Sequence, residues 1–289
     1  MKKIRICFLI LLPCCTGLAS CGLLTKDGAL PEGDRWRLVW QDRFGRNGAP
    51  DSAKWTFAGR GKANWNCYCT DTAAVTIVQN GKLHLRGIKG KEGAEAPGYA
   101  TGCISTKGKF AFRYGKLEVR AWFSGGQGSW PAIWLMPQEG VYGGWPQSGE
   151  IDVMEHLNRD TVVYQTLHSH YIDVAGRKKD PLYFVTAAFN EDEFNIFGIE
   201  WYPCRIDFFV NGRKTFSYPR RKDAGTNQWP FDQEFYIILN QALGGSWAGK
   251  IDDRGLPAEM QVDWVRVYKR KQATGALDQP VHTPVGSLD

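Results

Sequence analysis

The chain has 289 residues, of which 43% are hydrophobic and 13% aromatic, and its formal net charge is +6 at pH 7. This length is enough for one large domain with a substantial buried core. The basic residues do not form runs interleaved with aromatic residues, so the sequence argues against a nucleic-acid partner.

The first twenty residues, 1–20, have the pattern of a secretory signal. Basic residues within the first five positions precede the apolar run 6–12, which is too short to span a bilayer stably. The segment Leu18–Cys21 then resembles the lipobox of bacterial lipoproteins, which implies cleavage before Cys21 and acylation of that cysteine. The alternative is an ordinary signal peptide cleaved nearby. We therefore expect an exported protein held by a lipid anchor on a bacterial membrane, at the outer membrane or cell surface.

The remaining chain is expected to form a short tether at 21–34, one domain at 35–270 and a flexible tail at 271–289. Within the domain, alternating apolar and polar residues punctuated by glycine and proline predict β-strands. The predicted strands lie at 35–44, 75–79, 82–86, 110–123, 161–169, 194–201, 206–210, 214–218, 235–243 and 260–268.

Two Asn-Gly pairs, Asn80-Gly81 and Asn211-Gly212, lie between such strands and predict hairpin turns. Long helical periodicity is absent, and no internal repeat or second domain is visible. Many strands at short spacing predict an all-β sandwich or barrel.

Four cysteines lie inside the predicted domain: Cys67, Cys69, Cys103 and Cys204. An exported location permits disulfides, but spacing alone does not fix their pairing. We expect one disulfide from Cys67 or Cys69 to Cys103. The Cys-x-Cys pair is a weak metal signal, because neither a second close pair nor a nearby histidine accompanies it.

The most informative stretch is 148–156, where three carboxylates alternate with apolar side chains. In a strand, Glu150 and Asp152 point to one face and the apolar residues 151 and 153 to the other. Strict alternation would place Glu155 on the wrong face. A β-bulge at 153–154 would return it to the face of the other two carboxylates, and bulges are frequent beside active sites.

The spacing of Glu150 and Glu155 suits a specific chemistry. Allowing for the bulge, their Cα atoms are expected to lie roughly 13 Å apart, at ~3.3 Å per residue. Two inward-leaning glutamates can approach the ~5–5.5 Å carboxyl separation used by retaining glycosidases. Asp152 between them can hold a nucleophile in place by sharing a proton or hydrogen bond.

A solvated acidic stretch, or an amphipathic helix with Asp152 and Glu155 on one side, would also fit these residues. Pro146 and Gly149 just upstream favour a turn into a strand.

Tryptophans supply a second functional signal. Trp130, Trp145 and Trp247 each lie in a segment rich in glycine or proline, where turns are expected. Tryptophan in a loop of an all-β scaffold suits stacking on the apolar face of a sugar ring. Burial in the core is the alternative for any one of them.

These motifs together resemble glycoside hydrolase family 16. The segment 150–156 resembles the bulged Glu-x-Asp-x-x-Glu signature of that family, and further similar motifs follow in the family's order. The other matching segments are 128–137, 229–232, 239–240, 244–247 and 262–268.

The resemblance, which covers roughly 35–270, implies a β-jelly-roll sandwich of two curved antiparallel sheets with substrate on the concave face. It implies that Glu150 is the nucleophile, Asp152 its supporting carboxylate and Glu155 the general acid/base. Crowding by the other two carboxylates should raise the pKa of Glu155, as an acid that starts protonated requires.

The same resemblance implies substrate-binding roles for residues around the carboxylates. Trp130 and Trp134 match tryptophans near the donor subsites. His168 matches a neighbouring strand, where it would contact the acid/base or the acceptor sugar, unless it is a core or rim histidine. The other expected substrate-binding residues are Asn64, Trp145, Asn240 and Trp247.

Many family members carry a structural calcium, and the carbonyl of Gly81 and the side chain of Asp263 match its ligands. Asp263 is alternatively a plain strand-end residue. No cofactor is expected for catalysis, and the protein is expected to be a monomer.

Three departures from the laminarinase pattern bear on the substrate: residues 64–70, Ser246 in Gly-Gly-Ser-Trp, and the Leu-His-Ser sequence around His168. The expected activity is endo-hydrolysis, with retention, of β-1,3- or mixed-linkage β-1,3/1,4-glucan. The alternative is an endo-β-galactosidase acting on host O-glycans, poly-N-acetyllactosamine or another galactan. A non-catalytic surface glycan-binding protein is the alternative from another class, and the intact set of carboxylates argues against it.

Overall fold

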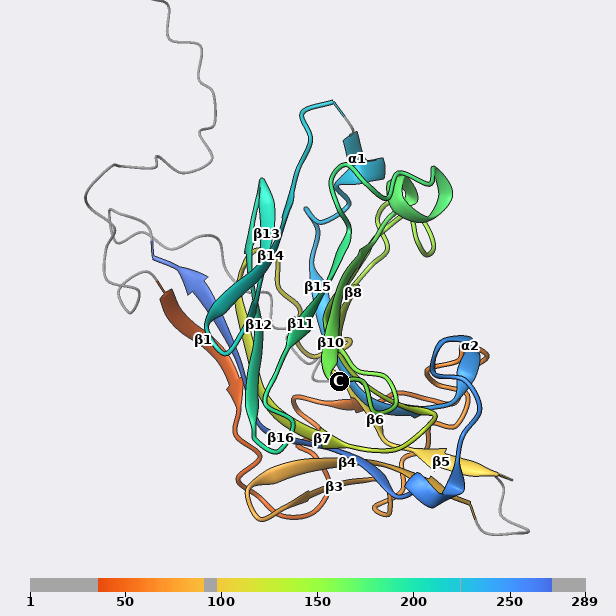
Figure 1. The fold of residues 1–289 in the computed structure, drawn as a ribbon. Helices are drawn as coiled ribbons and strands as arrows, with labels where there is room; N and C mark the ends of the chain where they lie inside the picture. The colour runs from red at the N-terminus through yellow and green to blue at the C-terminus, as the bar shows by residue number, and fades with distance from the viewer. Residues whose placement is uncertain (1–35, 91–97, 224, 272–289) are drawn as a thin grey trace, which may run out of the picture.

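The computed structural model describes residues 36–90, 98–223 and 225–271, which form an all-β fold of two antiparallel sheets (Figure 1). The predicted two-sheet architecture is confirmed. The predicted signal, the tether with Cys21 and residues 272–289 of the predicted tail lie outside the described residues. Within the described ranges, none of the helices combines the length and the apolar character that crossing a membrane requires.

The first sheet has the strand order β14-β13-β12-β7-β16-β4-β3, with β1 paired to β16 and β5 paired to β4. Its strands are β1 (Trp36–Asp42), β3 (Thr76–Gln79), β4 (Lys82–Lys89), β5 (Tyr99–Thr101), β7 (Gly115–Ser124), β12 (Asn195–Tyr202), β13 (Arg205–Val210), β14 (Arg213–Pro219) and β16 (Ala258–Arg270).

The second sheet has the order β11-β10-β9-β8-β15-β6-β2. Its strands are β2 (Thr56–Phe57), β6 (Cys103–Ser105), β8 (Ser129–Pro137), β9 (Glu150–Glu155), β10 (Val162–His168), β11 (Phe184–Ala188) and β15 (Phe235–Leu243). The connections carry short helical turns: the π-turn η2 (His170–Val174), α1 (Gly225–Gln228), α2 (Gly245–Ala248) and the 3-10 turn η3 (Asp253–Gly255).

Both predicted hairpins are confirmed. Asn80 and Gly81 have φ of 53° and 72°, and Asn211 and Gly212 have φ of 51° and 76°. Two successive positive φ values are the geometry that an Asn-Gly pair adopts at low cost in a two-residue hairpin. These turns join β3 to β4 and β13 to β14.

Three expectations needed correction. The strand expected at 110–123 begins only at Gly115, whose positive φ of 128° and close approach to the Tyr268 carbonyl suit a residue without a Cβ. Trp130 lies inside β8, opposite Ala242, and not in a turn. The edge strand β11 and the short strands β2, β5 and β6 were not predicted from the sequence.

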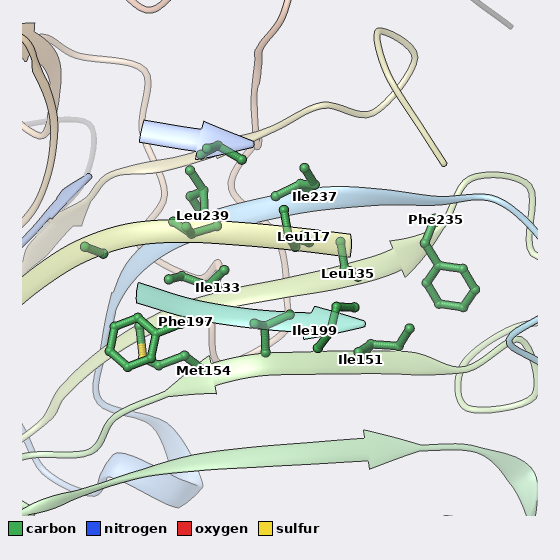
Figure 2. Packing of buried hydrophobic residues seen from close by; sticks show 14 of the residues in the cluster. Leu117, Ile133, Leu135, Ile151, Met154, Phe197, Ile199, Phe235, Ile237 and Leu239 are labelled. Atoms are coloured by element: carbon green, nitrogen blue, oxygen red, sulfur yellow. The ribbon is translucent and has the colours of Figure 1, made fainter. Parts of the chain in front are cut away.

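Apolar side chains from both sheets meet between them (Figure 2). Leu117 and Ile199 from the first sheet and Ile133, Ile151 and Leu239 from the second are at most 1% exposed. Burial of each such side chain stabilises the fold by roughly 1.5–3 kcal/mol. Because one face of each strand packs into this core, only the opposite face can carry side chains of a functional site.

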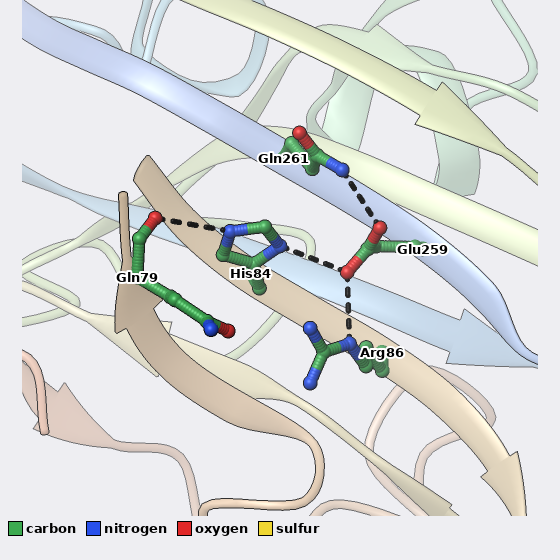
Figure 3. A network of polar contacts seen from close by, with 5 residues as sticks. All are labelled: Gln79, His84, Arg86, Glu259 and Gln261. Atoms are coloured by element: carbon green, nitrogen blue, oxygen red, sulfur yellow. Dashed lines mark hydrogen bonds and ion pairs between the residues drawn. The ribbon is translucent and has the colours of Figure 1, made fainter. Parts of the chain in front are cut away.

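A polar network ties β4 to β16 on the side chains that alternate with the core residues (Figure 3). Glu259 accepts hydrogen bonds from Arg86 Nε (2.8 Å) and Gln261 Nε2 (2.8 Å) and contacts His84 Nδ1 at 2.9 Å. Burial raises the pKa of Glu259, but these partners outweigh it and lower the pKa below its usual value. The network therefore stabilises the folded protein fully at pH values above the ordinary pKa of glutamate. This contribution is lost as the pH falls and Glu259 becomes protonated.

The predicted disulfide forms between Cys69 and Cys103, whose Cα atoms lie 5.9 Å apart. Cys67 keeps a free thiol, and burial raises its pKa. The disulfide attaches the segment before Cys69, which carries Asn64 and Trp65, to strand β6.

Candidate active site

Strand β9 carries the three carboxylates and contains the predicted bulge. Asp152 pairs with Trp134 of β8 and Thr166 of β10, and Glu155 pairs with Ala132 and Tyr164. Between these paired positions, β9 therefore contains one residue more than β8 or β10.

The apolar residues Val153 and Met154 at the bulge both point into the core and are 0% exposed. Because the extra residue is absorbed there, Glu155 returns to the face of Glu150 and Asp152. The helical alternative for this segment is wrong, since it is hydrogen-bonded to strands on both sides.

Glu150 is half-buried and receives a strong hydrogen bond from the preceding loop. Trp145 Nε1 donates to Glu150 Oε2 at 2.6 Å, while 57% of the Trp145 side chain stays exposed. Burial and the nearby Asp152 raise the pKa of Glu150, and His168 and the Trp145 indole oppose this rise. The net pKa of Glu150 is still raised well above its usual value, and the Trp145 N–H and the charge of His168 are the two influences that favour its ionised form.

Glu155 is only 7% exposed, and Trp130 Nε1 donates to its Oε1 at 2.9 Å. Burial is the main cause that raises the pKa of Glu155 well above its usual value, followed by the charge of Asp152. A carboxyl group held protonated near neutral pH is suited to act as a general acid.

His168, at the end of β10, lies between two carboxylates. Its Nε2 is 3.4 Å from Asp152 Oδ2 and its Nδ1 is 3.1 Å from Asp173 Oδ1. Burial disfavours the imidazolium, but the contacts with Asp152 and Asp173 outweigh it and raise the pKa of His168 to about 12. The histidine thus places a positive charge beside Glu150 and Asp152.

Trp134 is packed tightly on the same face as the carboxylates. It is 6% exposed, its Nε1 donates to Asn240 Oδ1 at 2.7 Å, and the ring of Trp65 meets it edge-on with centroids 4.9 Å apart. Asn240 is 0% exposed, so the expected direct contact of Asn240 with substrate is not available. Its buried side chain instead orients Trp134.

Trp247 lies in the short helix α2, within the glycine-rich segment where a turn was expected. It is 43% exposed and meets the rings of Trp130 and Tyr164, with centroids 5.6 Å and 5.3 Å away. Asn64 Nδ2 donates to Ser246 Oγ at 2.9 Å, which joins the loop before the disulfide to the same turn. Trp247 and Trp145 therefore present exposed indole surface near the Glu155 and Glu150 ends of β9, respectively.

The two expected calcium ligands lie on the first sheet, away from the carboxylates. Asp263 Oδ2 accepts a hydrogen bond from Arg120 Nη1, and Gly81 belongs to the β3–β4 turn. Because a guanidinium already neutralises Asp263, the residues as they lie do not fit a calcium ion, and the calcium site stays a prediction. Among the described residues, Glu150, Asp152 and His168 form a cluster with metal-ligand spacing. The charge on His168 disfavours a cation there.

Three residues of the site were not predicted from the sequence: Asp173, Tyr164 and Trp65. Asp173 follows β10 by a single turn and belongs to no recognised motif. Trp65 lies in the stretch 64–70, whose departure from the laminarinase pattern was the available signal.

Comparisons with known proteins agree with this geometry. A family model described as glycosyl hydrolases family 16 matches residues 62–266. The keratan-sulfate endo-1,4-beta-galactosidase of Sphingobacterium multivorum is 43% identical over 235 residues, which cover 81% of this chain and 55% of that protein. The beta-glucanase of Rhodothermus marinus is 34% identical over 87% of this chain and 91% of its own length.

Among solved structures, the laminarinase from Rhodothermus marinus is similar, with a TM-score of 0.74 and 33% identity. The match covers 82% of this chain and 98% of that one. These matches, together with a bulged strand bearing three carboxylates, show that the chain belongs to the glycosyl hydrolases family 16.

Proposed function

We propose that the protein is an endo-acting retaining β-glycoside hydrolase that cleaves a β-linked polysaccharide by double displacement. The observation that carries this proposal is the unequal surroundings of two glutamates on one face of β9. Glu150 accepts the indole N–H of Trp145 and lies in a cluster with His168, whereas Glu155 is almost fully buried and accepts the indole N–H of Trp130.

In the first step, the Glu150 carboxylate attacks the anomeric carbon while Glu155 donates its proton to the glycosidic oxygen. The bond from the anomeric carbon to that oxygen breaks, and a glycosyl ester forms on Glu150. In the second step, Glu155 takes a proton from water, whose oxygen attacks the same carbon and releases Glu150. Asp152 supports Glu150, and two displacements give net retention.

The two glutamates should give different variants. In Glu155→Ala the nucleophile remains, so a substrate with a good leaving group should form the glycosyl ester, which then accumulates because no base activates water. Intact mass spectrometry should show one added glycosyl unit, and peptide mapping should place it on Glu150. The matched variant Glu150→Ala should show no adduct. An adduct on Asp152, or wild-type products of inverted configuration, would contradict the mechanism.

For the substrate, we propose β-1,3- or mixed-linkage β-1,3/1,4-glucan, which is supported by the glucanase and laminarinase relatives. A β-galactoside is the second candidate, because the galactosidase named above is 43% identical. The departures from the laminarinase pattern at Ser246 and residues 64–70 weaken, without excluding, a plain β-1,3-glucan assignment.

Digestion of laminarin, mixed-linkage β-glucan, keratan sulfate, agarose and mucin-type glycans, with product lengths determined, would separate these substrates. Turnover of none, with retained binding to one of them, would support the glycan-binding alternative instead.

We further propose that residues 35–270 act as one monomeric catalytic domain on a lipid anchor at Cys21, on the outer membrane or cell surface. The support is the lipobox-like sequence 18–21. Cys21→Ala should release the protein from membranes without changing its specific activity. Membrane retention of this variant through lipid would contradict the anchor, and sedimentation of the released protein would test the monomer.

A further inference from the structure

The turn that follows β10 brings a fourth carboxylate to the site. Asp173 lies in η2, five residues after His168, and its Oδ1 is 3.1 Å from His168 Nδ1. On its other side, His168 faces β9, with Nε2 3.4 Å from Asp152 Oδ2. The imidazole therefore bridges two carboxylates that come from different elements.

Asp173 is itself held in place. Its Oδ2 accepts a hydrogen bond from the backbone N–H of Ser169 at 3.0 Å, and Ser169 is 0% exposed. The next turn is closed by the backbone bond from Ile172 N to the Ser169 carbonyl at 3.1 Å, and Ile172 is fully buried. One oxygen of Asp173 is thus fixed by the backbone, and the other is directed at His168.

This arrangement defines the protonation of the ring. One carboxylate is hydrogen-bonded to Nδ1 and a second lies at ion-pair distance from Nε2, and this arrangement favours a proton on each nitrogen, which makes the ring an imidazolium. The charged groups that face it are Glu150 and Asp152 from β9 and Asp173 from η2, and the fourth neighbour is the neutral ring of Trp145, with centroids 5.8 Å apart. Three carboxylates surround one cation.

We propose that Asp173 is a positioning residue of the active site, which holds His168 as an imidazolium with Nε2–H directed at Asp152 and so favours the ionised nucleophile Glu150. The proposal rests on the role assigned to Glu150 above. Asp173 acts only through His168.

The first test reads the charge of His168 directly and needs no enzymatic activity. Ring 15N chemical shifts of histidine-labelled full-length protein, assigned with His168→Gln, should show an imidazolium from pH 5 to 9 in the wild type. In Asp173→Asn, which removes the negative charge but keeps the size, His168 should lose its proton within that range. A neutral ring in the wild type at pH 7, or an unchanged imidazolium in Asp173→Asn, would overturn the proposal.

The second test is the pH dependence of kcat/KM. Loss of the imidazolium removes a charge that stabilises ionised Glu150, so Asp173→Asn should move the acidic limb to higher pH. The deprotonation of His168 should add a fall in activity on the alkaline side. At pH 7 we expect kcat/KM to fall roughly 10- to 100-fold, the scale of a lost charge-assisted hydrogen bond.

Asp180→Asn is the matched control, because Asp180 lies in the same connection, is exposed and pairs with Arg221. It should keep the wild-type profile. If Asp173→Asn lowers activity at all pH values equally while His168 stays charged, Asp173 has only a structural role and the proposal fails. An inactive wild type with the expected 15N shifts would instead count against the proposed function alone.

Discussion

At the scale of single residues, neighbouring donors distinguish two chemically identical side chains. Glu150 receives the Trp145 indole N–H and faces the His168 cation, whereas Glu155 receives only the Trp130 indole N–H. Both glutamates are raised in pKa by burial and by Asp152. Because the pKa of both glutamates is raised well above its usual value, the extra charge-stabilising contacts of Glu150 are what favour it as the nucleophile and Glu155 as the acid/base.

Trp145→Phe tests this separation, because it removes the indole donor and keeps an aromatic ring. Without that donor the pKa of Glu150 should rise, so the acidic limb of kcat/KM should move to higher pH, with a loss of roughly 10- to 100-fold at pH 5. Trp130→Phe should instead raise the pKa of Glu155 and move the alkaline limb to higher pH. The roles would be misassigned if each substitution moved the opposite limb.

At the scale of elements, the site depends on attachments between segments far apart in the sequence. The bulge in β9 directs Glu155 outward, η2 supplies Asp173, and the Cys69–Cys103 disulfide holds the segment that carries Trp65 against Trp134. In each case, the path of the backbone determines where a side chain of the site lies.

The disulfide closes a loop with a sequence separation of 34 residues. A loop of this size is expected to stabilise the fold by about 3–4 kcal/mol, chiefly by restricting the unfolded chain. The double variant Cys69→Ala/Cys103→Ala should therefore unfold at a lower urea concentration with this loss of free energy. Cys67→Ala, the matched control with a free thiol, should stay close to the wild type. Equal stability of both variants would show that the cross-link contributes little.

At the scale of the whole molecule, the apolar core between the two sheets offsets the cost of burying acidic side chains on β9. Asp152 and Glu155 are 1% and 7% exposed, and both lie beside other carboxylates. Burying charge in this way is unfavourable, and it is retained where function requires it. The structure thus combines an apolar interior that stabilises the fold with buried carboxylates on β9 that destabilise it.

Glu155→Gln should accordingly stabilise the protein at neutral pH. The pKa of Glu155 is higher in the folded than in the unfolded state, so the wild type loses stability as pH rises above the ordinary glutamate value of about 4.3. Glutamine does not titrate, and the variant should gain roughly 0.5–2 kcal/mol at pH 7, with the gain vanishing near pH 4.

Thermal unfolding across this pH range checks the expected gain. The exposed Glu139→Gln serves as the control and should stay within about 0.5 kcal/mol of the wild type. A pH-independent gain in Glu155→Gln would contradict the explanation.

The sequence by itself determined the all-β class, the Asn-Gly hairpins, the bulge at 153–154 and the set of three carboxylates. These follow from local rules, because alternation, turn residues and short motifs act over a few neighbouring positions. The sequence left Cys67 and Cys69 as alternative disulfide partners of Cys103. Only the fold shows that Cys69 forms the bond.

Tertiary structure alone decided the rest. Asn240 is polar and lies in a matching motif, yet its burial against Trp134 makes it a support, not a ligand-facing group. Asp173 has no sequence signal, because its position depends on how η2 folds back over the end of β10. The neighbouring glycine and proline predict a turn at Trp130, but pairing with β15 makes this residue part of strand β8. In each case, contacts between residues distant in the sequence outweigh the local preference.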